Sequence, residues 1–409
     1  MLRLSKNIGP GFLLAGAAVG VSHLVQSTRA GAEYGWILII ALLIACISKY
    51  PFLKMGPRYT AARGKNLIEG YKALGKFQYY TYIIISLGTM FIGMAAITLV
   101  TGGIVSFLIP IGISLTVWCG IVLLICVLLL LLGRYKALDK TMKLIISVLT
   151  IITCLAVGMA IFNLEAPRNP IELPSLTTSA SIAFIVAFMG WMPIPIDASV
   201  WHSIWTKEKS HQTGKPTSLR DVTQDFNIGY IGSSVIGVLF FMLGVLIMFG
   251  SGISFSNSGV IFSEQLIDMY AQTLGQWTKP IIGFAAFITL FSTTLTVADA
   301  FPRVFSEVSL VEGHSKKTAF KVYVVTLLLL CFISLGIIHF GTSQFKLLVD
   351  FATGLSFLSA PFLAWFNYQL FQQNDIPEEF KFSPSFKFFS LACLAVLIGL
   401  NVIYLWSLY

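Results

Sequence analysis

The chain has 409 residues, of which 56% are hydrophobic and only 11% are charged. Soluble domains carry roughly 25% charged residues, so this composition excludes an ordinary soluble protein. The net charge of +9 would suit a nucleic-acid or lipid partner, but the basic residues are spread over many short links between apolar runs, so we expect no nucleic-acid binding. All six cysteines lie inside apolar runs without a C-x-x-C pair, which argues against a disulfide framework or a zinc site.

Apolar runs of about 20 residues predict a polytopic membrane protein with an all-α fold, because a helix of that length crosses the hydrocarbon core of a bilayer. Eleven transmembrane helices are expected, at residues 9–30, 35–55, 78–107, 113–133, 142–163, 182–205, 228–250, 280–302, 319–340, 346–370 and 388–408.

The basic residues predict the orientation. If the N-terminus is cytoplasmic, the inner links hold nearly all of them, and the outer links hold only Arg29, Arg168, Lys279 and Lys346. This bias toward the inside follows the positive-inside rule. We therefore expect an integral protein of a bacterial inner membrane, with lipid as its surroundings. The sequence leaves the oligomeric state open.

Two polar links between spans are long enough to comment on. The outer link contains an amphipathic stretch, residues 260–275 (VIFSEQLIDMYAQTLG), which predicts a short helix lying over the outer mouth. The inner link, residues 206–225, is rich in charge and is expected to be a solvated connection.

The sixth span cannot be one continuous helix. Pro193 and Pro195 each remove a backbone donor, and the residues before them are pushed toward extended geometry. Asp197 follows immediately. A broken membrane helix with a carboxylate at the break is typical of a transporter binding site.

The first span shows the same organisation. Gly16 and Gly20 lie midway along it, and polar residues follow them. Interrupted helices at corresponding places in two five-span halves predict a 5+5 inverted repeat with broken helices 1 and 6. We expect one transporter domain, 1–409, with repeats at about 9–163 and 182–370 and an extra helix at about 388–408.

The segment GPGFLLAGAAVGVSHLVQSTRAGAEYGW (residues 9–36) resembles the first span of the natural resistance-associated macrophage protein (NRAMP) family of divalent-metal transporters. The resemblance extends over nearly the whole chain, including a sixth span that ends in His202-Ser203 and an eighth span rich in Ser and Thr. It implies a LeuT-type fold and proton-linked uptake of manganese or iron by alternating access.

The chain departs from the family pattern at its ligand positions. Gly20-Val21-Ser22-His23 stands where the family has Asp-Pro-Gly-Asn, and the third span has no acidic residue within 90–107. The family's sixth-span Met-Pro-His can be matched in two ways. One match uses Met192-Pro193; the other, anchored on His202-Ser203, puts Pro195 at the methionine and Asp197 at the histidine. We favour the second.

Asp197 is the strongest site candidate, because a carboxylate at membrane depth is costly unless it is paired or meets water. The alternative is an ion pair that locks two spans. Imidazole suits first-row metals, so His23 is a candidate ligand, with a histidine bonded to a carbonyl at the break as its alternative. The resemblance also implies that Thr353 contacts metal. The expected substrate and metal positions are Gly20, Ser22, His23, Met192, Pro195, Asp197, Ser199 and Thr353.

Proton coupling or gating is expected at Asp197, His202 and Asp299. Asp299 lies near the predicted inner end of the eighth span at Pro302-Arg303, and a pair with Arg303 at i+4 is the structural alternative. For His202 the structural alternative is a histidine packed between helices. For Arg29 it is an ion pair with Glu33. Asp350 is expected to be a gate or interface residue near the outer surface.

The sequence carries no enzyme motif, and we expect no cofactor beyond a transported divalent cation and coupling protons. The leading hypothesis is secondary active transport of manganese or iron, with magnesium as a further candidate. The rival is symport of a small organic or anionic solute on the same scaffold, favoured by the missing first-span aspartate. A non-transporting sensor is a third and weaker hypothesis, because no extramembrane domain is predicted.

Overall fold

The computed structural model describes residues 9–133, 135–162 and 174–407, without the side chains of 135–146 and of residue 343. Within this part the secondary structure is helical and no strand occurs. The predicted inner positions of Arg3, Lys6, Arg134, Lys136, Lys140 and Lys143, the predicted outer position of Arg168 and the predicted span ends at 163 and 408 fall outside the described residues or side chains.

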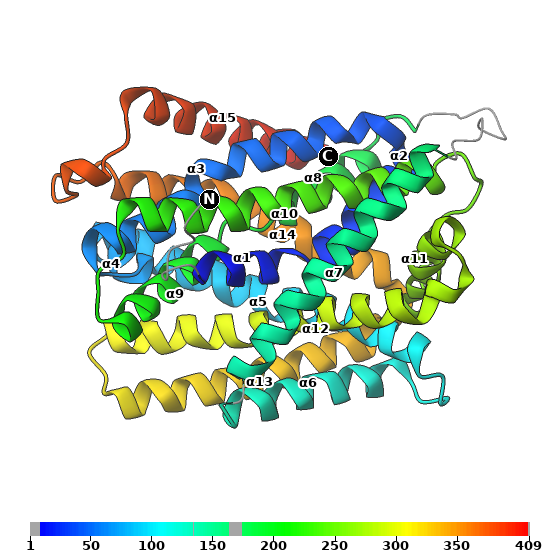
Figure 1. Ribbon diagram of the computed structural model, residues 1–409. Helices are drawn as coiled ribbons and strands as arrows, with labels where there is room; N and C mark the ends of the chain where they lie inside the picture. The colour runs from blue at the N-terminus through cyan, green and yellow to red at the C-terminus, as the bar shows by residue number, and fades with distance from the viewer. Residues whose placement is uncertain (1–8, 134, 163–173, 408–409) are drawn as a thin grey trace, which may run out of the picture.

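The first part of the chain forms nine elements (Figure 1). They are α1 (Pro10–Ala18), a π-helical turn (Ser22–Ser27), α2 (Thr28–Tyr34), a 3-10 turn (Gly35–Leu38), α3 (Ile39–Arg63), α4 (Leu67–Leu74), α5 (Lys76–Leu108), α6 (Leu115–Leu131) and α7 (Tyr135–Phe162).

The second part contains the remaining helices. They are α8 (Ser179–Trp191), α9 (Ala198–Thr213), α10 (Leu219–Ile247), α11 (Gly259–Leu274), α12 (Lys279–Val311), α13 (Lys316–Gly341), α14 (Phe345–Leu370) and α15 (Pro384–Trp406), with 3-10 turns at Gln276–Thr278, Thr342–Gln344 and Glu378–Phe380.

Many of these helices have the length and hydropathy of membrane spans. Among the described residues, seven helical segments are long and apolar enough to cross a membrane, and three shorter apolar helices accompany them. Rim helices expose large apolar side chains: Phe332 of α13 is 78% exposed and Phe388 of α15 is 76% exposed. Such faces suit contact with lipid rather than water.

Both predicted breaks are present. α1 ends at Ala18, and helical structure resumes as a π-helical turn at Ser22. α8 ends at Trp191, and α9 begins at Ala198, after the two prolines. The sequence prediction that the first and sixth spans are interrupted is therefore confirmed.

Local sequence explains where several helices begin. Five hydroxyl side chains accept a hydrogen bond from the backbone N–H three residues on, which satisfies one of the free donors of the first turn. They are Ser114, Thr178, Ser218, Ser315 and Ser383. Asn66 and Glu69 form a reciprocal capping box at α4. Gly64 and Gly214 end α3 and α9 with positive φ, which costs glycine little.

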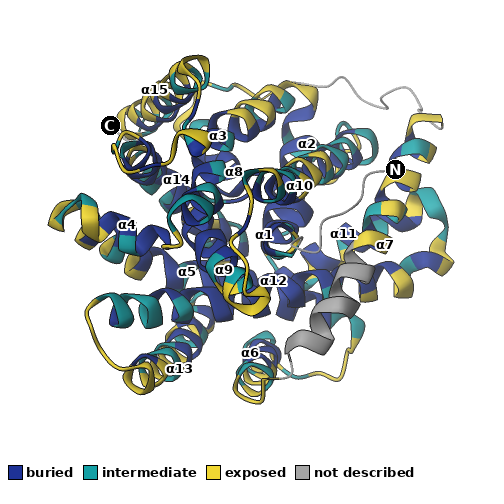
Figure 2. Cartoon of the chain, turned by 60° about the vertical axis from the view of Figure 1, so that its left-hand side comes forward, coloured by how far each residue is buried: buried dark blue, intermediate teal, exposed yellow. Residues whose placement is uncertain are grey.

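The broken spans lie in the middle of the bundle. α8 packs on α14, α9 on α3, and α1 on α10 and α12, while α5 packs on α12 and α14. Figure 2 shows that α1, α8 and α12 are largely buried, whereas α6, α13 and α15 carry exposed faces at the rim. Polar groups at the breaks are therefore held away from the surroundings by the other helices.

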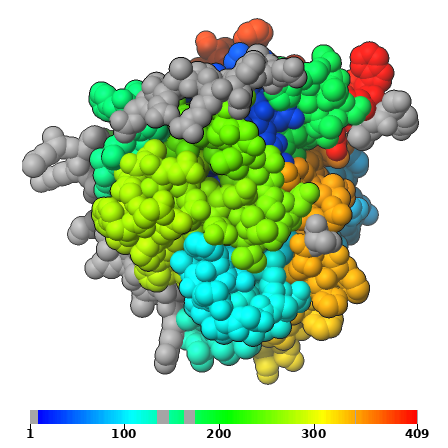
Figure 3. Space-filling view, turned by 90° about the vertical axis from the view of Figure 1, so that its right-hand side faces the viewer, coloured from blue at the N-terminus to red at the C-terminus, as the bar shows by residue number. Residues whose placement is uncertain are grey.

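Two further sequence expectations can be judged. The predicted short helix over one mouth is present as α11, which covers that end of the molecule together with the segments beside it (Figure 3). The expectation that Pro302-Arg303 ends the eighth span is wrong, because α12 continues to Val311 with Pro302 inside it. A proline removes one helical hydrogen bond, and a well-packed membrane helix tolerates that loss.

Candidate transport site at the helix breaks

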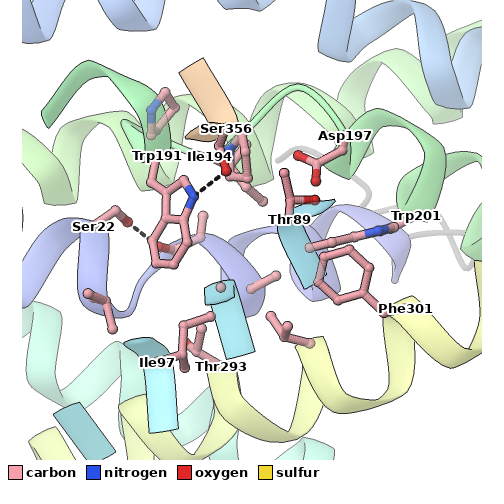
Figure 4. A pocket seen from close by; sticks show the side chains of 17 residues that line it. Ser22, Thr89, Ile97, Trp191, Ile194, Asp197, Trp201, Thr293, Phe301 and Ser356 are labelled. Atoms are coloured by element: carbon pink, nitrogen blue, oxygen red, sulfur yellow. Dashed lines mark hydrogen bonds between the residues drawn. The ribbon is translucent and has the colours of Figure 1, made fainter. Parts of the chain in front are cut away.

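A small buried cavity lies between the two breaks. Its volume is about 40 Å³, enough for roughly three water molecules. Residues of both broken spans line it, together with residues of α5, α12 and α14 (Figure 4). The polar lining side chains are Ser22, Thr89, Asp197, Thr293 and Ser356, and the aromatic ones are Trp191, Trp201 and Phe301.

Asp197 is the only acidic side chain in this lining, and it sits directly before α9. It is 4% exposed, and its side chain does not cap the helix that follows. The described part of the chain provides no basic side chain in ion-pair contact with it. A buried carboxylate in this situation is costly to maintain, so it is available for a cation or a proton.

Ser22 and Trp191 occupy the side of the cavity away from Asp197 (Figure 4). Ser22 Oγ donates to the Ala18 carbonyl at 2.8 Å, which satisfies an acceptor freed by the end of α1. The indole Nε1 of Trp191 donates to Ser356 Oγ of α14 at 2.8 Å, which fixes the ring across the cavity. Gly20 packs on Thr293, since an added Cβ there would lie 2.5 Å from Thr293 Oγ1.

His23 and Met192 are not part of the cavity lining. The imidazole of His23 is fully buried: Nε2 lies 2.8 Å from the Ser233 carbonyl of α10, and Nδ1 lies 2.7 Å from Ser22 Oγ. A Cβ added at Gly237 of α10 would lie 2.8 Å from Met192 Sδ and 3.5 Å from His23 Cδ2. Both side chains therefore face α10. The expected meeting of His23 and Asp197 around one cavity is not found. His23 is bonded to a carbonyl, as its alternative expected, but this carbonyl belongs to Ser233 of α10 and not to the break.

Pro195 lines the cavity beside Asp197, and Pro193 and Ile194 line it as well, so the lining does not separate the two matches of the sixth-span motif. Among the described residues no group of three or more His, Cys, Asp or Glu side chains is placed to hold a metal. A cation in the cavity would therefore depend on Asp197, neutral oxygens and retained water, a ligand set typical of hard divalent ions.

Ser199 and Thr353 are buried elsewhere. Ser199 Oγ accepts a hydrogen bond from Asn367 Nδ2 at 2.9 Å. The Thr353 hydroxyl donates to the Val349 carbonyl at 2.9 Å and lies 3.2 Å from Gln26 Nε2. The backbone of Thr353 touches Gly190, where a Cβ would lie 1.9 Å from the Thr353 carbonyl oxygen. These residues join the broken helices to α14 without reaching the cavity.

His202 lies one turn beyond the cavity, against α10. Its Nε2 is 3.7 Å from Asp225 Oδ2, and neither ring nitrogen has a hydrogen-bond partner in the described part of the chain. The Asp225 carboxylate accepts from the backbone N–H groups of Gly9 and Gly11 at 2.9 and 2.6 Å. Asp225 thus connects the start of α1 to α10, and the imidazole of His202 lies beside its carboxylate.

Asp299 is paired, as the structural alternative expected. Its carboxylate accepts from Arg303 Nε at 2.5 Å and from the Tyr323 hydroxyl of α13 at 2.7 Å. Arg303 also reaches Glu208 of α9 at 3.2 Å. The cluster joins α12, α13 and the second half of the sixth span, away from the cavity.

An ion cluster whose residues do not line the cavity joins α2 to α14. Both terminal nitrogens of the buried Arg29 donate to Asp350, at 2.8 and 3.3 Å, and Arg29 Nε lies 3.4 Å from Glu33. Gln26 Nε2 donates to the same Asp350 carboxylate at 2.8 Å. The expected i+4 pair of Arg29 with Glu33 is present, but the main partner is Asp350.

Sequence reasoning missed Lys49 of α3. Its Nζ lies 2.6, 2.7, 3.1 and 3.4 Å from the carbonyl oxygens of Met189, Gly190, Met192 and Ile194, at the sixth-span break. The signal was available, because Lys49 falls inside the predicted span 35–55, and an ionisable residue at membrane depth is a functional candidate by default.

Comparison with known proteins gives one family and one fold. A sequence model of the natural resistance-associated macrophage protein-like family matches residues 11–407. An uncharacterized protein of Pasteurella multocida is 37% identical over 373 residues, covering 89% of this chain and 84% of that protein. Metal transporter Nramp3 of Oryza sativa subsp. japonica is 23% identical over 308 residues, 72% of this chain and 54% of that protein.

Two solved structures share the fold. The Eremococcus coleocola manganese transporter, in complex with an aromatic bis-isothiourea substituted compound, has a TM-score of 0.67 at 16% identity, over 97% of this chain and 85% of that one. MhsT in complex with L-phenylalanine has a TM-score of 0.65 at 15% identity, over 98% of each chain. At these identities the likeness shows a LeuT-like architecture.

Proposed function

Because the chain belongs to the natural resistance-associated macrophage protein-like family, we propose that it carries a divalent metal cation across the membrane by alternating access. The family consists of transporters, so the chain is an integral membrane transporter and not an enzyme. Manganese and iron are the first candidate substrates, and magnesium is a further one. Protons are proposed as the coupling ions.

The proposal includes a topology. One transporter domain has eleven spans, arranged as a 5+5 inverted repeat with broken spans 1 and 6 and an additional α15, in a bacterial inner membrane with the N-terminus cytoplasmic. The two observed breaks and the LeuT-like neighbours support this arrangement. The seven longer segments and three shorter apolar helices make ten, and the eleventh span comes from dividing Ser22–Arg63. Its part before α3 joins α1 to form the first span, and α3 is the second.

The observation that carries the proposal is the buried carboxylate of Asp197, which has no ion-pair partner among the described residues, in the small cavity between the breaks. A volume of about 40 Å³ suits an ion with a few waters better than a larger solute. Ser22 and Thr293 offer hydroxyl oxygens in the same lining. Helix breaks are also where backbone oxygens become free to replace the hydration shell of an ion.

Alternating access requires closures on both sides of the cavity. We propose Arg29 with Asp350 as the outer closure, because it joins α2 to α14. We propose Arg303 with Glu208, and Lys207 with Glu69 at 2.8 Å, as the inner closure, because these pairs join α9 to α12 and α4. The pairs at the inner end are partly exposed, so each contributes little stability and can exchange.

For proton coupling we propose Asp197 as the acceptor within the cavity and His202 as the next group toward the inside. The support is positional, since His202 lies on α9 beyond Asp197 and beside the carboxylate of Asp225. Protonation of His202 would strengthen its attraction to Asp225, which holds the start of α1. A proton on His202 would thereby change the interaction of Asp225 with the inner end of the first span.

A second candidate function is symport of a small organic solute. The cavity favours it in one respect, because Trp191, Trp201 and Phe301 line it while the soft ligands His23 and Met192 do not. Aromatic faces with one carboxylate suit a small organic cation. A larger cavity in another conformation would be needed to hold such a solute.

The test is manganese uptake into proteoliposomes under an inward proton gradient. We expect saturable uptake by the parent protein and a loss on the order of 100-fold in Asp197→Ala, which corresponds to about 2.7 kcal/mol. The matched control is Asp268→Ala, which removes a carboxylate paired with Lys279 outside the cavity. This variant should keep the parent rate.

Uptake of no divalent ion above empty vesicles would reject metal transport. Thermal stabilisation by organic cations in place of metals would then favour the second candidate, and Asp197→Ala should abolish that stabilisation as well. Equal losses in the two variants would show that Asp197 has no special role.

A further inference from the structure

Lys49 of α3 is a fully buried basic residue that makes no ion pair within the described part of the chain, although the carboxylate of Asp197 acts on it electrostatically. Its side chain is 0% exposed, and its amine reaches four backbone carbonyl oxygens between 2.6 and 3.4 Å. Two of these oxygens belong to Met189 and Gly190 at the end of α8, and two belong to Met192 and Ile194 in the break. The amine has three protons to donate, so the four oxygens can satisfy it completely.

Neutral oxygens alone are an unusual environment for a buried ammonium group. Buried charges are normally paired with an opposite charge, as Arg29 is with Asp350. Within the described residues no carboxylate makes an ion pair with Lys49. The positive charge is balanced instead by carbonyl dipoles and by the negative end of α8, whose last carbonyls have no partner within the helix.

The same set of oxygens has the chemistry of a monovalent-cation site. Unwound carbonyls and the C-terminal ends of half-helices coordinate small cations in broken-helix transporters. A hard ion is held there by several oxygens that point at one position. Here that position is filled by an atom of the chain itself, delivered by α3.

We propose that the carbonyl oxygens of Met189, Gly190, Met192 and Ile194 form a monovalent-cation cage whose resident cation is the Lys49 ammonium group. The chain carries this cation covalently, so the cage needs no sodium or potassium ion from solution. The amine also ties the segment that leads into Asp197 to α3. This role does not depend on which substrate the protein carries.

The proposal is tested by removing the tether and supplying a free cation. Lys49→Ala leaves the cage empty and should lower the melting temperature of the detergent-purified protein by several degrees in a choline buffer. Methylammonium at equal ionic strength should restore most of the loss, because it brings the same charged head group. The parent protein should melt at the same temperature in both buffers.

Two control variants and one control cation separate the cage from a general salt effect. Lys49→Met fills the space with an uncharged chain, so it should melt low and gain nothing from methylammonium. Lys54→Ala removes a partly exposed amine from the same helix, which bonds to the Tyr50 hydroxyl at 3.2 Å and lies over the ring of Phe386, and it should show no cation response. Tetramethylammonium, which cannot donate a hydrogen bond, should fail to rescue Lys49→Ala.

Three results would overturn the proposal. They are a parent-like melting temperature for Lys49→Ala in choline, equal rescue by tetramethylammonium, and equal rescue of Lys49→Met. If Lys49→Ala does not accumulate as folded protein, Lys49→Ser gives the same comparison, because its short side chain also leaves the cage open.

Discussion

The two helix breaks solve the same problem with different chemistry. Each break leaves carbonyl oxygens without a helical partner. At the end of α1 the partner is neutral: the Thr293 hydroxyl lies 3.1 Å from the carbonyls of both Gly16 and Val19. At the end of α8 the partner is the charged amine of Lys49, which reaches four carbonyls.

The segments that follow the breaks are also fixed differently. After the first break, His23 and Ser27 bond to carbonyls of α10, Ser27 Oγ at 2.6 Å from Gly237. After the sixth break, Ser199 is held by Asn367 of α14, while the carboxylate of Asp197 has no such bond. The first break is thus neutral and closed by hydrogen bonds. The sixth break holds the amine of Lys49, which has four carbonyl partners, and the carboxylate of Asp197, which has no ion-pair partner among the described residues. We therefore place the proposed substrate site there.

The largest expected effect concerns the charged donor. Lys49→Met should lower the free energy of unfolding by on the order of 3 kcal/mol, because several buried carbonyls lose their donor and no water replaces it. Chemical unfolding in detergent, followed by tryptophan fluorescence, measures this. Replacement of a buried ion pair by apolar groups is often neutral, but that requires both partners to be removed, and here the carbonyls remain.

The control for this change is Lys54→Met on the same helix. Its amine is partly exposed and bonds to Tyr50 of the same helix, so a change below about 1 kcal/mol is expected. If the two substitutions cost the same, the contrast between a charged and a neutral break has no energetic basis.

The next effect separates a ligand from a packed side chain. His23→Leu should lower the free energy of unfolding by about 2 kcal/mol, since the bonds to Ser233 and Ser22 are lost. Affinity for the transported metal should change little, because the imidazole faces α10 and not the cavity. Metal-binding calorimetry checks this.

The folded fraction must be matched before affinities are compared, and Ser27→Ala is a suitable reference because it removes a similar bond to α10. A loss of metal affinity in His23→Leu, with parent affinity in Ser27→Ala, would restore His23 as a ligand.

The sequence was sufficient to predict where the two helices break. It was not sufficient to predict which way the side chains near the breaks point. Pro193 and Pro195 exclude a continuous helix. Asp197, the strongest site candidate in the sequence, lines the cavity between the two breaks. The direction of His23 could not be read, because Ser22–Ser27 form a π-helical turn instead of an α-helix. A π turn changes which neighbours share a face, so Ser22 meets the cavity while His23 meets α10.

Lys49 shows a different limit. A lysine near the end of an apolar run has two uses, as a topological signal or as a buried partner, and the residues around it do not distinguish them. Only the packing of α3 on α9 and on the end of α8 shows that its amine meets the sixth-span break. Contacts between segments that lie far apart in sequence determine both the direction of His23 and the partners of Lys49.

The smallest expected effect is at the neutral break. Thr293→Val keeps the shape of the side chain and removes one hydroxyl, which donates to only one of its carbonyl neighbours at a time. We expect a loss of about 1 kcal/mol in the free energy of unfolding, measured as for Lys49→Met. Because Thr293 also lines the cavity, Thr294→Val is the matched control: its hydroxyl lies 2.8 Å from Thr101 and not in the lining. If the two threonine variants match in stability and only Thr293→Val weakens metal binding, the hydroxyl acts on the substrate and not on the break. A loss as large as that of Lys49→Met would mean that the first break depends on its donor as strongly as the sixth, and the distinction between a neutral and a charged break would no longer explain where the substrate binds.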